Sequence, residues 1–309
     1  KRLWPLSSEA SPKQFLRFDS DHNLFQEAVL RVNNADYFTS PLIVGSKKHR
    51  SLITESLEGI SVSPLEVLLE AKALNTAAAI DSAIRFLIDN CLDASPALVM
   101  PSDQRFTENL AFTQTMLEAS CCLKREAIIT FGSLPTHPSS KYGYILPEKS
   151  FAEGNNSMRK VTNFVEKPSA PIAKNLIANG GLWNSGMFMF YPRAMLGEIQ
   201  QYCTSLAESD LSIDHAVMER TNLAQVMMLE DHWEDLGTIS SLHKIGHKDP
   251  SNNVLSDGVL AQDTSDCYIH SGGAKIVTVG VKNLAIINTK DGILIADIKR
   301  TDKLNIAIR

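Results

Sequence analysis

The chain has 309 residues, 44% hydrophobic and 21% charged, so it can bury a large core and support one large domain plus a smaller one. The formal net charge of −5 argues against general nucleic-acid binding, and the most apolar runs are strand-sized rather than the roughly 20 residues needed to cross a bilayer. The five cysteines lack C-x-x-C spacing, which indicates buried thiols in a reducing compartment. We expect a cytoplasmic protein that binds neither nucleic acid nor membrane.

Short β-rich runs alternate with amphipathic stretches over residues 1–247, the pattern of a Rossmann-like, doubly wound α/β fold. Strands are expected at 41–44, 66–69, 97–100, 127–131, 142–146, 161–165 and 187–191, and helices at 49–57, 75–87 and 108–119. From about residue 248, apolar runs separated by Asp, Gly, Ser and Asn replace the helices. The pattern predicts two domains, 1–247 and a small all-β domain at 248–309.

Two cations near the start, Arg2 and Lys13, are joined to rigid turns and apolar anchors. Arg offers a planar fork of donors and Lys a compact charge, and phosphoryl chemistry uses both because the reacting group carries spread negative charge. Pro5 and Pro12 fix the backbone between them. Most such pairs are only solvated surface, so the flanking residues must support the interpretation.

A carboxylate, Asp103, directly follows the expected strand 97–100. Open α/β sheets bind ligands beyond the carboxyl ends of their strands, and a carboxylate is a hard oxygen ligand of the kind that Mg²⁺ prefers. The alternative is that Asp103 caps a following helix.

For a nucleotide ligand, the identity of the base can be argued from Glu70 and the following segment that begins at Asn75, which we take as substrate-binding residues. Guanine presents an N1–H and a 2-amino group side by side, and a carboxylate can accept both hydrogens. A uracil or thymine site would favour an amide there. Glu70 therefore favours guanine.

Five segments resemble the sugar nucleotidyltransferase family. Its signature G-G-x-G-T-R-L-W-P-L-S, then P-K-Q-F, matches the chain from Arg2 to Phe15, and we expect the family's first strand and glycines to precede Lys1. The other matches are Pro101-Ser102-Asp103, Phe164-Val165-Glu166-Lys167-Pro168, Trp183-Asn184-Ser185-Gly186-Met187-Phe188 and Trp233-Glu234-Asp235-Leu236-Gly237. They occur in the family's order over nearly the whole chain.

The resemblance is strongest to members that make GDP-mannose and pyrophosphate from GTP and mannose 1-phosphate, and it implies a mixed sheet, a short left-handed β-helix at the C-terminus and a homodimer. Arg2 and Lys13 would hold the departing pyrophosphate, and Lys167 the sugar 1-phosphate. Mg²⁺ would lie on Asp103 and Asp235, although Asp235 could instead be a turn residue before Gly237.

By the same resemblance, Glu166 and Asn184 would contact the sugar. Neighbouring side chains on a strand point to opposite faces, so we expect Glu166 and Lys167 to serve different parts of a ligand rather than pair with each other. Without the family, Glu166 and Lys167 would be a solvated pair, and Asn184 a loop residue making an Asx-turn into Gly186.

Three departures from the family pattern favour alternatives. Leu74 replaces an Arg, Gln104 replaces a His, and the chain is shorter between Tyr202 and Leu211. The protein could instead be a catalytically weak regulator that binds sugar nucleotides, or a nucleotidyltransferase for another sugar 1-phosphate or base.

Overall fold

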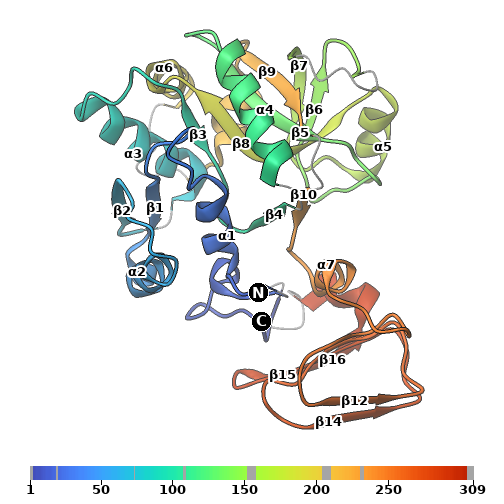
Figure 1. The fold of residues 1–309 in the computed structure, drawn as a ribbon. Coiled ribbons are helices and arrows are strands. Elements are labelled where there is room, and N and C mark those ends of the chain that lie inside the picture. The colour runs from blue at the N-terminus through green and yellow to red at the C-terminus, as the bar shows by residue number, and fades with distance from the viewer. Residues whose placement is uncertain are drawn as a thin grey trace. The chain divides into compact units, whose positions relative to one another are not determined.

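In the computed structural model, the chain forms two compact units (Figure 1). The structure describes residues 3–18, 20–72, 74–106, 109–151, 158–203, 210–229 and 233–304. The first unit combines Lys1–Leu30, Ser102–Arg105 and Glu234–Arg309, and the second combines Arg31–Pro101 with Phe106–Trp233. The domain boundary at 247/248 stays a prediction.

The second unit is built on a six-stranded mixed sheet in the order β3-β8-β5-β9-β7-β6. The central strand β5 is parallel to β9 and antiparallel to β8. A separate parallel pair joins β1 to β2. The strands are β1 (Leu42–Ser46), β2 (Glu66–Glu70), β3 (Ala97–Val99), β5 (Ile128–Ser133), β6 (Tyr144–Pro147), β7 (Arg159–Val165), β8 (Leu182–Phe190) and β9 (Ala224–Met228). The helices are α2 (Arg50–Glu58), α3 (Asn75–Asp89), α4 (Asn109–Cys122), α5 (Ala170–Ala178), α6 (Pro192–Tyr202), a 3₁₀ turn Lys47–His49 and a π-helix Asp214–Met218.

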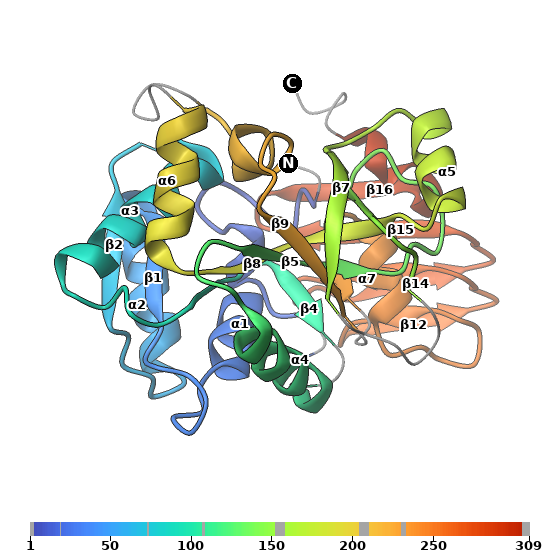
Figure 2. The same cartoon turned by 90° about the horizontal axis from the view of Figure 1, so that it is seen from above.

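Both faces of this sheet are covered by helices, because its strands alternate between two apolar cores. Ile128 packs in a core with α3, α6 and the π-helix, whereas its neighbour Ile129 packs in a second core with α4 and α5. Phe188 and Met189 of β8 divide in the same way. Figure 2 shows α4 on one side of the sheet and α6 on the other. The expected doubly wound, mixed α/β fold is confirmed.

The first unit packs the N-terminal segment against the C-terminal β module. Leu3 and Leu24 share one core with Ile287 and Leu294 of the module. The Thr289 hydroxyl donates to the carbonyl of Pro5 at 3.2 Å, and a Cβ at Gly292 would overlap the Trp4 ring. The module therefore supports the loop that carries the N-terminal motif.

The module itself consists of stacked parallel strands. β11, β13 and β15 pair in parallel, β12 pairs with β14 in parallel, and β16 closes β15 as an antiparallel hairpin.

The elements of the whole first unit are a 3₁₀ turn Lys13–Phe15, α1 (Leu24–Arg31), α7 (Ile239–Ile245), β11 (Val254–Leu255), β12 (Val259–Gln262), β13 (Tyr268–His270), β14 (Ile276–Val279), β15 (Leu284–Thr289), β16 (Gly292–Asp297) and a 3₁₀ helix Ile298–Lys303. Two further strands, β4 (Gln104–Phe106) and β10 (Trp233–Asp235), pair with each other. The expected β-helix-like module is confirmed.

Two local expectations were wrong. Strand β8 begins at Leu182 rather than at residue 187, so Asn184 lies within a strand and not in a loop. The cysteines are not all buried, since Cys91, Cys121 and Cys122 are exposed. Residues 121 and 122 lie in the last turn of α4, where consecutive side chains point about 100° apart and cannot both face the core.

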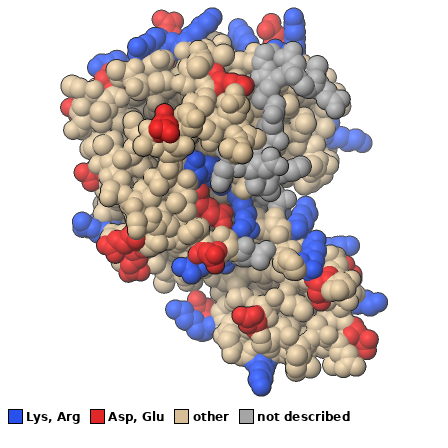
Figure 3. Space-filling view, viewed as in Figure 1, with Lys and Arg blue, Asp and Glu red and all other residues tan. Residues whose placement is uncertain are grey.

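The distribution of charged side chains on the surface is consistent with the modest net charge. On the face in Figure 3, acidic and basic side chains are interspersed rather than gathered into one large patch of a single sign. Among the described residues, no helix is long and apolar enough to cross a membrane.

The core of the first unit gives a test of its packing. Replacing Ile287, which is 0% exposed, by Ala should lower the free energy of unfolding by about 2–5 kcal/mol, because the cavity left is only partly filled. The matched change at Ile295, which is 68% exposed on the adjacent strand, should shift it by less than about 0.5 kcal/mol. Denaturant unfolding measures both, and equal shifts would contradict this packing.

Candidate active site

In the first unit, Lys13 and Asp103 form an ion pair although 90 residues separate them. The Lys13 Nζ lies 3.2 Å from Asp103 Oδ2, with the lysine side chain 15% exposed and the aspartate 45% exposed. Lys13 begins a short 3₁₀ turn, where Phe15 contacts the Phe25 ring. Asp103 is followed by strand β4, so it does not cap a helix. The two residues expected to handle phosphate and metal are therefore neighbours.

Asp235 and Arg2 are the other two residues expected to bind metal and phosphate beside Lys13 and Asp103. Asp235 is the last residue of β10, and Asp103 immediately precedes β4, the strand with which β10 pairs. The Asp235 side chain and all of Arg2 lie outside the described residues.

The donor set fits a divalent cation of the hard type. Among the described residues there is no cluster of three or more His, Cys, Asp and Glu side chains that could hold a metal. Mg²⁺, however, is commonly bound by one or two carboxylates together with substrate phosphates. The partly exposed carboxylate of Asp103 offers the oxygen ligands that such a site requires.

In the second unit, the segment around Asn184 is a bulge in β8. Thr130 pairs with Phe188 but Gly132 pairs with Asn184, so β8 carries two more residues than β5 over this stretch. Gly186 takes φ +73°, which a side chain would strain, and the Ser185 hydroxyl donates to the Phe131 carbonyl at 2.7 Å. The bulge therefore explains why a serine and a glycine follow Asn184 in the sequence.

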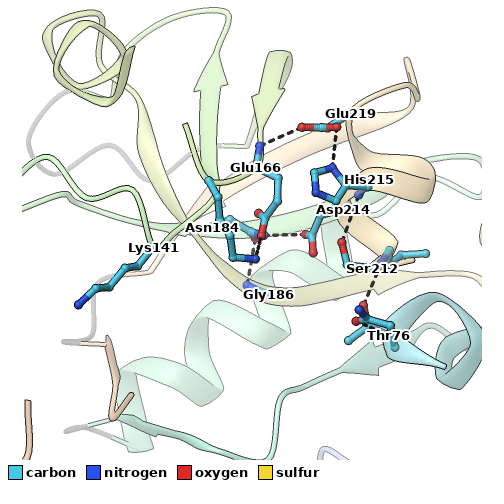
Figure 4. A network of polar contacts seen from close by, with 12 residues as sticks. Thr76, Lys141, Glu166, Asn184, Gly186, Ser212, Asp214, His215 and Glu219 are labelled. Carbon is cyan, nitrogen blue, oxygen red and sulfur yellow. Dashed lines mark hydrogen bonds and ion pairs between the residues drawn. The ribbon is translucent and has the colours of Figure 1, made fainter. Parts of the chain in front are cut away.

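Asn184 is held from several sides. Its Oδ1 accepts from the Gly186 N–H at 3.0 Å, which is the Asx-type contact considered from the sequence, and from the Thr130 hydroxyl at 3.3 Å. Its Nδ2 donates to Asp214 Oδ1 at 2.8 Å (Figure 4). Asn184 is only 7% exposed. The side chain is thus fixed in one orientation, and sugar contact stays a prediction for it.

Glu166 and Lys167 form an ion pair, contrary to expectation. Strand β7 ends at Val165, and Lys167 takes φ +46°, so the alternation of side chains along a strand no longer applies. The Glu166 side chain is 7% exposed and that of Lys167 is 57% exposed. The lysine therefore presents its charge to solvent while the glutamate lies beneath it.

Two residues that the sequence did not single out complete this cluster. Glu219 Oε1 accepts from the Glu166 N–H at 2.9 Å, and its Oε2 lies 3.0 Å from His215 Nδ1 (Figure 4). Partial burial would raise the pKa of the Glu219 carboxyl, but these hydrogen bonds together with the charges of His215 and Arg220 outweigh it and lower the pKa. The sequence signal was two acidic residues, Asp214 and Glu219, on either side of a short apolar run.

The residues expected to read the base lie at the end of β2 and at the start of α3. Glu70 is the last residue of β2, in register with Ser46 of β1, and burial raises the pKa of its carboxyl. Asn75 is exposed, takes φ +66°, and its Oδ1 accepts from the Thr76 N–H at 2.9 Å. Base reading by either residue stays a prediction.

A mixed α/β sheet with charged side chains at a strand end is typical of folds that bind their ligands beyond the ends of the strands. The chain belongs to the nucleotidyl transferase family, whose model matches residues 1–252.

The chain is similar in sequence to curated proteins and in structure to a solved one. The chain is 33% identical to a mannose-1-phosphate guanylyltransferase of Salmonella montevideo, over 96% of this chain and 68% of that protein. It is 32% identical to the alginate biosynthesis protein AlgA of Pseudomonas aeruginosa, over 96% of this chain and 66% of that protein. The chain thus spans about two thirds of these relatives. A solved structure described as mannose-1-phosphate geranyltransferase from Thermus thermophilus matches with a TM-score of 0.87 and 26% identity, covering 99% of this chain and 94% of that one.

Asp214 should make stability depend on pH. Burial and, next, the Glu166 carboxylate raise the pKa of Asp214 from 3.8 to about 6. The folded state holds this proton more tightly than the unfolded chain, so the stabilisation is complete below about pH 4 and is lost as the pH rises through about 6. The Asp214→Asn variant lacks this loss. At pH 8 its free energy of unfolding should exceed that of the wild type by about 1–3 kcal/mol.

The difference should vanish below about pH 4, where Asp214 is protonated in both states. Denaturant unfolding at several pH values measures it, with Asp210→Asn as a control at an exposed carboxylate of the same segment. A difference that is constant with pH would contradict the titration of Asp214.

Proposed function

We propose that this protein transfers GMP from GTP to mannose 1-phosphate, forming GDP-mannose and pyrophosphate. The observation that carries the proposal is the 33% identity, over 96% of the chain, with a mannose-1-phosphate guanylyltransferase. The ion pairs of Lys13 with Asp103 and of Lys167 with Glu166 supply the charged groups that such a reaction needs.

In the proposed reaction, an oxygen of the sugar phosphate attacks the α-phosphorus of GTP. The bond from this phosphorus to the bridging α,β oxygen breaks, and pyrophosphate leaves with the electron pair. Because the phosphate nucleophile is already ionised at neutral pH, no general base is required. Lys13 and Arg2 bind the departing pyrophosphate and stabilise its charge.

The sugar phosphate is assigned to residues of the second unit. Lys167 is 57% exposed and binds the phosphate of mannose 1-phosphate. When its ammonium turns to this phosphate, the Glu166 carboxylate is released to accept hydrogen bonds from sugar hydroxyls. Asn184 lies beside it and orients the ring, while Glu70 and Asn75 bind the base.

Asp103 and Asp235 would hold the divalent cation, which we take to be Mg²⁺. When bound with the nucleotide, such an ion neutralises phosphate charge that develops during transfer. The proposal also includes a homodimer and a cytoplasmic location.

A turnover assay tests the activity. Purified protein with GTP, mannose 1-phosphate and Mg²⁺ should release pyrophosphate and form GDP-mannose in equal amounts. Parallel reactions with UTP or with glucose 1-phosphate test for another base or sugar. Tight binding of GDP-mannose without turnover of any pair would instead indicate the regulatory role that Leu74 and Gln104 suggested.

The carboxylate of Asp103 gives a sharper prediction. Asp103→Asn should lower kcat by about 100-fold or more while the KM for GTP changes less, because the carboxylate acts mainly on charge that develops in the transition state. Asp297→Asn, at an exposed carboxylate at the end of β16, is the control and should keep the wild-type kcat. Near wild-type turnover of Asp103→Asn at saturating Mg²⁺ would remove Asp103 from the site.

Base choice can be tested at Glu70. In Glu70→Gln a donor replaces one of two acceptors and faces a donor of guanine, which leaves a polar group unpaired. The ratio of kcat/KM for GTP to that for UTP should fall by about 5- to 150-fold. The ratio is taken on one preparation, so loss of folded protein cancels. If the ratio is unchanged, Glu70 does not read the base.

A further inference from the structure

A short π-helix and the residue after it contact both candidate sugar ligands of the second unit, Asn184 and Glu166. In the π-helix Asp214–Met218, the Glu219 N–H donates to the Asp214 carbonyl at 3.0 Å, a bond that spans five residues. In an α-helix, residues five apart point about 140° away from each other. The wider turn of a π-helix reduces this angle, and such turns are frequent at functional sites.

Each of the two acidic side chains uses this geometry to hold a different partner. Asp214 Oδ1 accepts from Asn184 Nδ2 at 2.8 Å, and Glu219 Oε1 accepts from the Glu166 N–H at 2.9 Å. Figure 4 shows Asn184, Glu166 and Asp214 turned toward one another, with Glu219 on the other side of the Glu166 backbone. The π-helix and the residue that follows it thus contact Asn184 on β8 and Glu166 just past the end of β7.

The contact from Glu219 falls where the chain changes direction. Glu166 follows the last residue of β7, and Lys167 then takes φ +46°, a region that non-glycine residues rarely occupy. An acceptor fixed on the Glu166 N–H limits how this turn can relax. The orientation of Lys167 therefore depends on Glu219, although the two side chains share no hydrogen bond among the described contacts.

We propose that Asp214 and Glu219 are positioning residues for the sugar phosphate, Asp214 through the Asn184 amide and Glu219 through the backbone of Glu166 and Lys167. Neither touches the reacting atoms. They set the orientation of the groups proposed to contact mannose 1-phosphate, and they do not act on the nucleotide.

The same segment is anchored independently at its other end. The Ile213 N–H donates to the Thr76 hydroxyl at 2.9 Å, and the Ala77 N–H donates to the Leu211 carbonyl at 3.3 Å, both at the start of α3. Ala216, Val217 and Met218 are buried in the core. A change at residue 214 or 219 should therefore leave the segment in place and alter only what it holds.

This inference rests on the proposed function, and its test compares the two substrates. Glu219→Ala and Asp214→Ala should each raise the KM for mannose 1-phosphate by about 10- to 100-fold, since each removes a charged acceptor from a hydrogen bond. The KM for GTP should change less than about threefold. Glu219→Gln and Asp214→Asn keep an acceptor oxygen and should restore the KM for mannose 1-phosphate to within about threefold of wild type.

Asp210→Asn removes an exposed carboxylate from the same segment and should leave both KM values unchanged. Thermal unfolding shows whether each variant is folded. If an alanine variant is not, Asp214→Leu and Glu219→Met, which keep the side-chain volume but lack the acceptor oxygens, should show the same selective rise in the KM for mannose 1-phosphate. Equal effects on both substrates, or no effect in folded variants that lack the acceptor, would overturn the inference. A wild-type protein without turnover would instead count against the proposed function.

Discussion

The change of register between β5 and β8 is the constraint on which the second unit's site depends. Both strands lie in the middle of the sheet, buried on both faces, so their pairing cannot slip without moving apolar side chains from one core to the other. The two extra residues of β8 must be accommodated as a bulge, and Gly186 with φ +73° makes this possible. The bulge turns Asn184 toward Asp214 instead of into a regular ladder.

Each of three acidic side chains near Asn184 has a positively charged or hydrogen-bonding counterpart. Glu166 is covered by Lys167, Glu219 is held by His215 and a backbone N–H, and Asp214 takes the donor of an amide. Burial and, next, the Glu166 carboxylate raise the pKa of Asp214 by more than its hydrogen bonds and the Lys167 charge lower it. A substrate phosphate that draws Lys167 away would leave Glu166 short of a donor, and sugar hydroxyls are groups that can supply one.

The first unit uses apolar packing to fix a polar pair. Leu3 and Leu24 are buried with residues of β15 and β16, and the hairpin between these strands lies against Trp4 and Pro5. This packing holds the backbone a few residues from Lys13, whose side chain meets Asp103. A small β module thereby supports the loop that leads to Lys13 by packing rather than by any chemical group of its own.

The sequence by itself determined the class of fold and the positions of most elements. It also singled out Lys13, Asp103, Glu70 and Glu166 as candidate site residues. It could do so because alternating apolar periodicity and motif order are local properties of the chain. Only the tertiary structure decided that Lys167 pairs with Glu166, since both lie past the end of β7 and Lys167 takes a left-handed conformation, so strand alternation no longer applies. The partners of Asp214 and Glu219 were likewise decided by the tertiary structure, because Asn184 of β8 and Glu166 past the end of β7 meet them only when a π-helix brings residues five apart to one side.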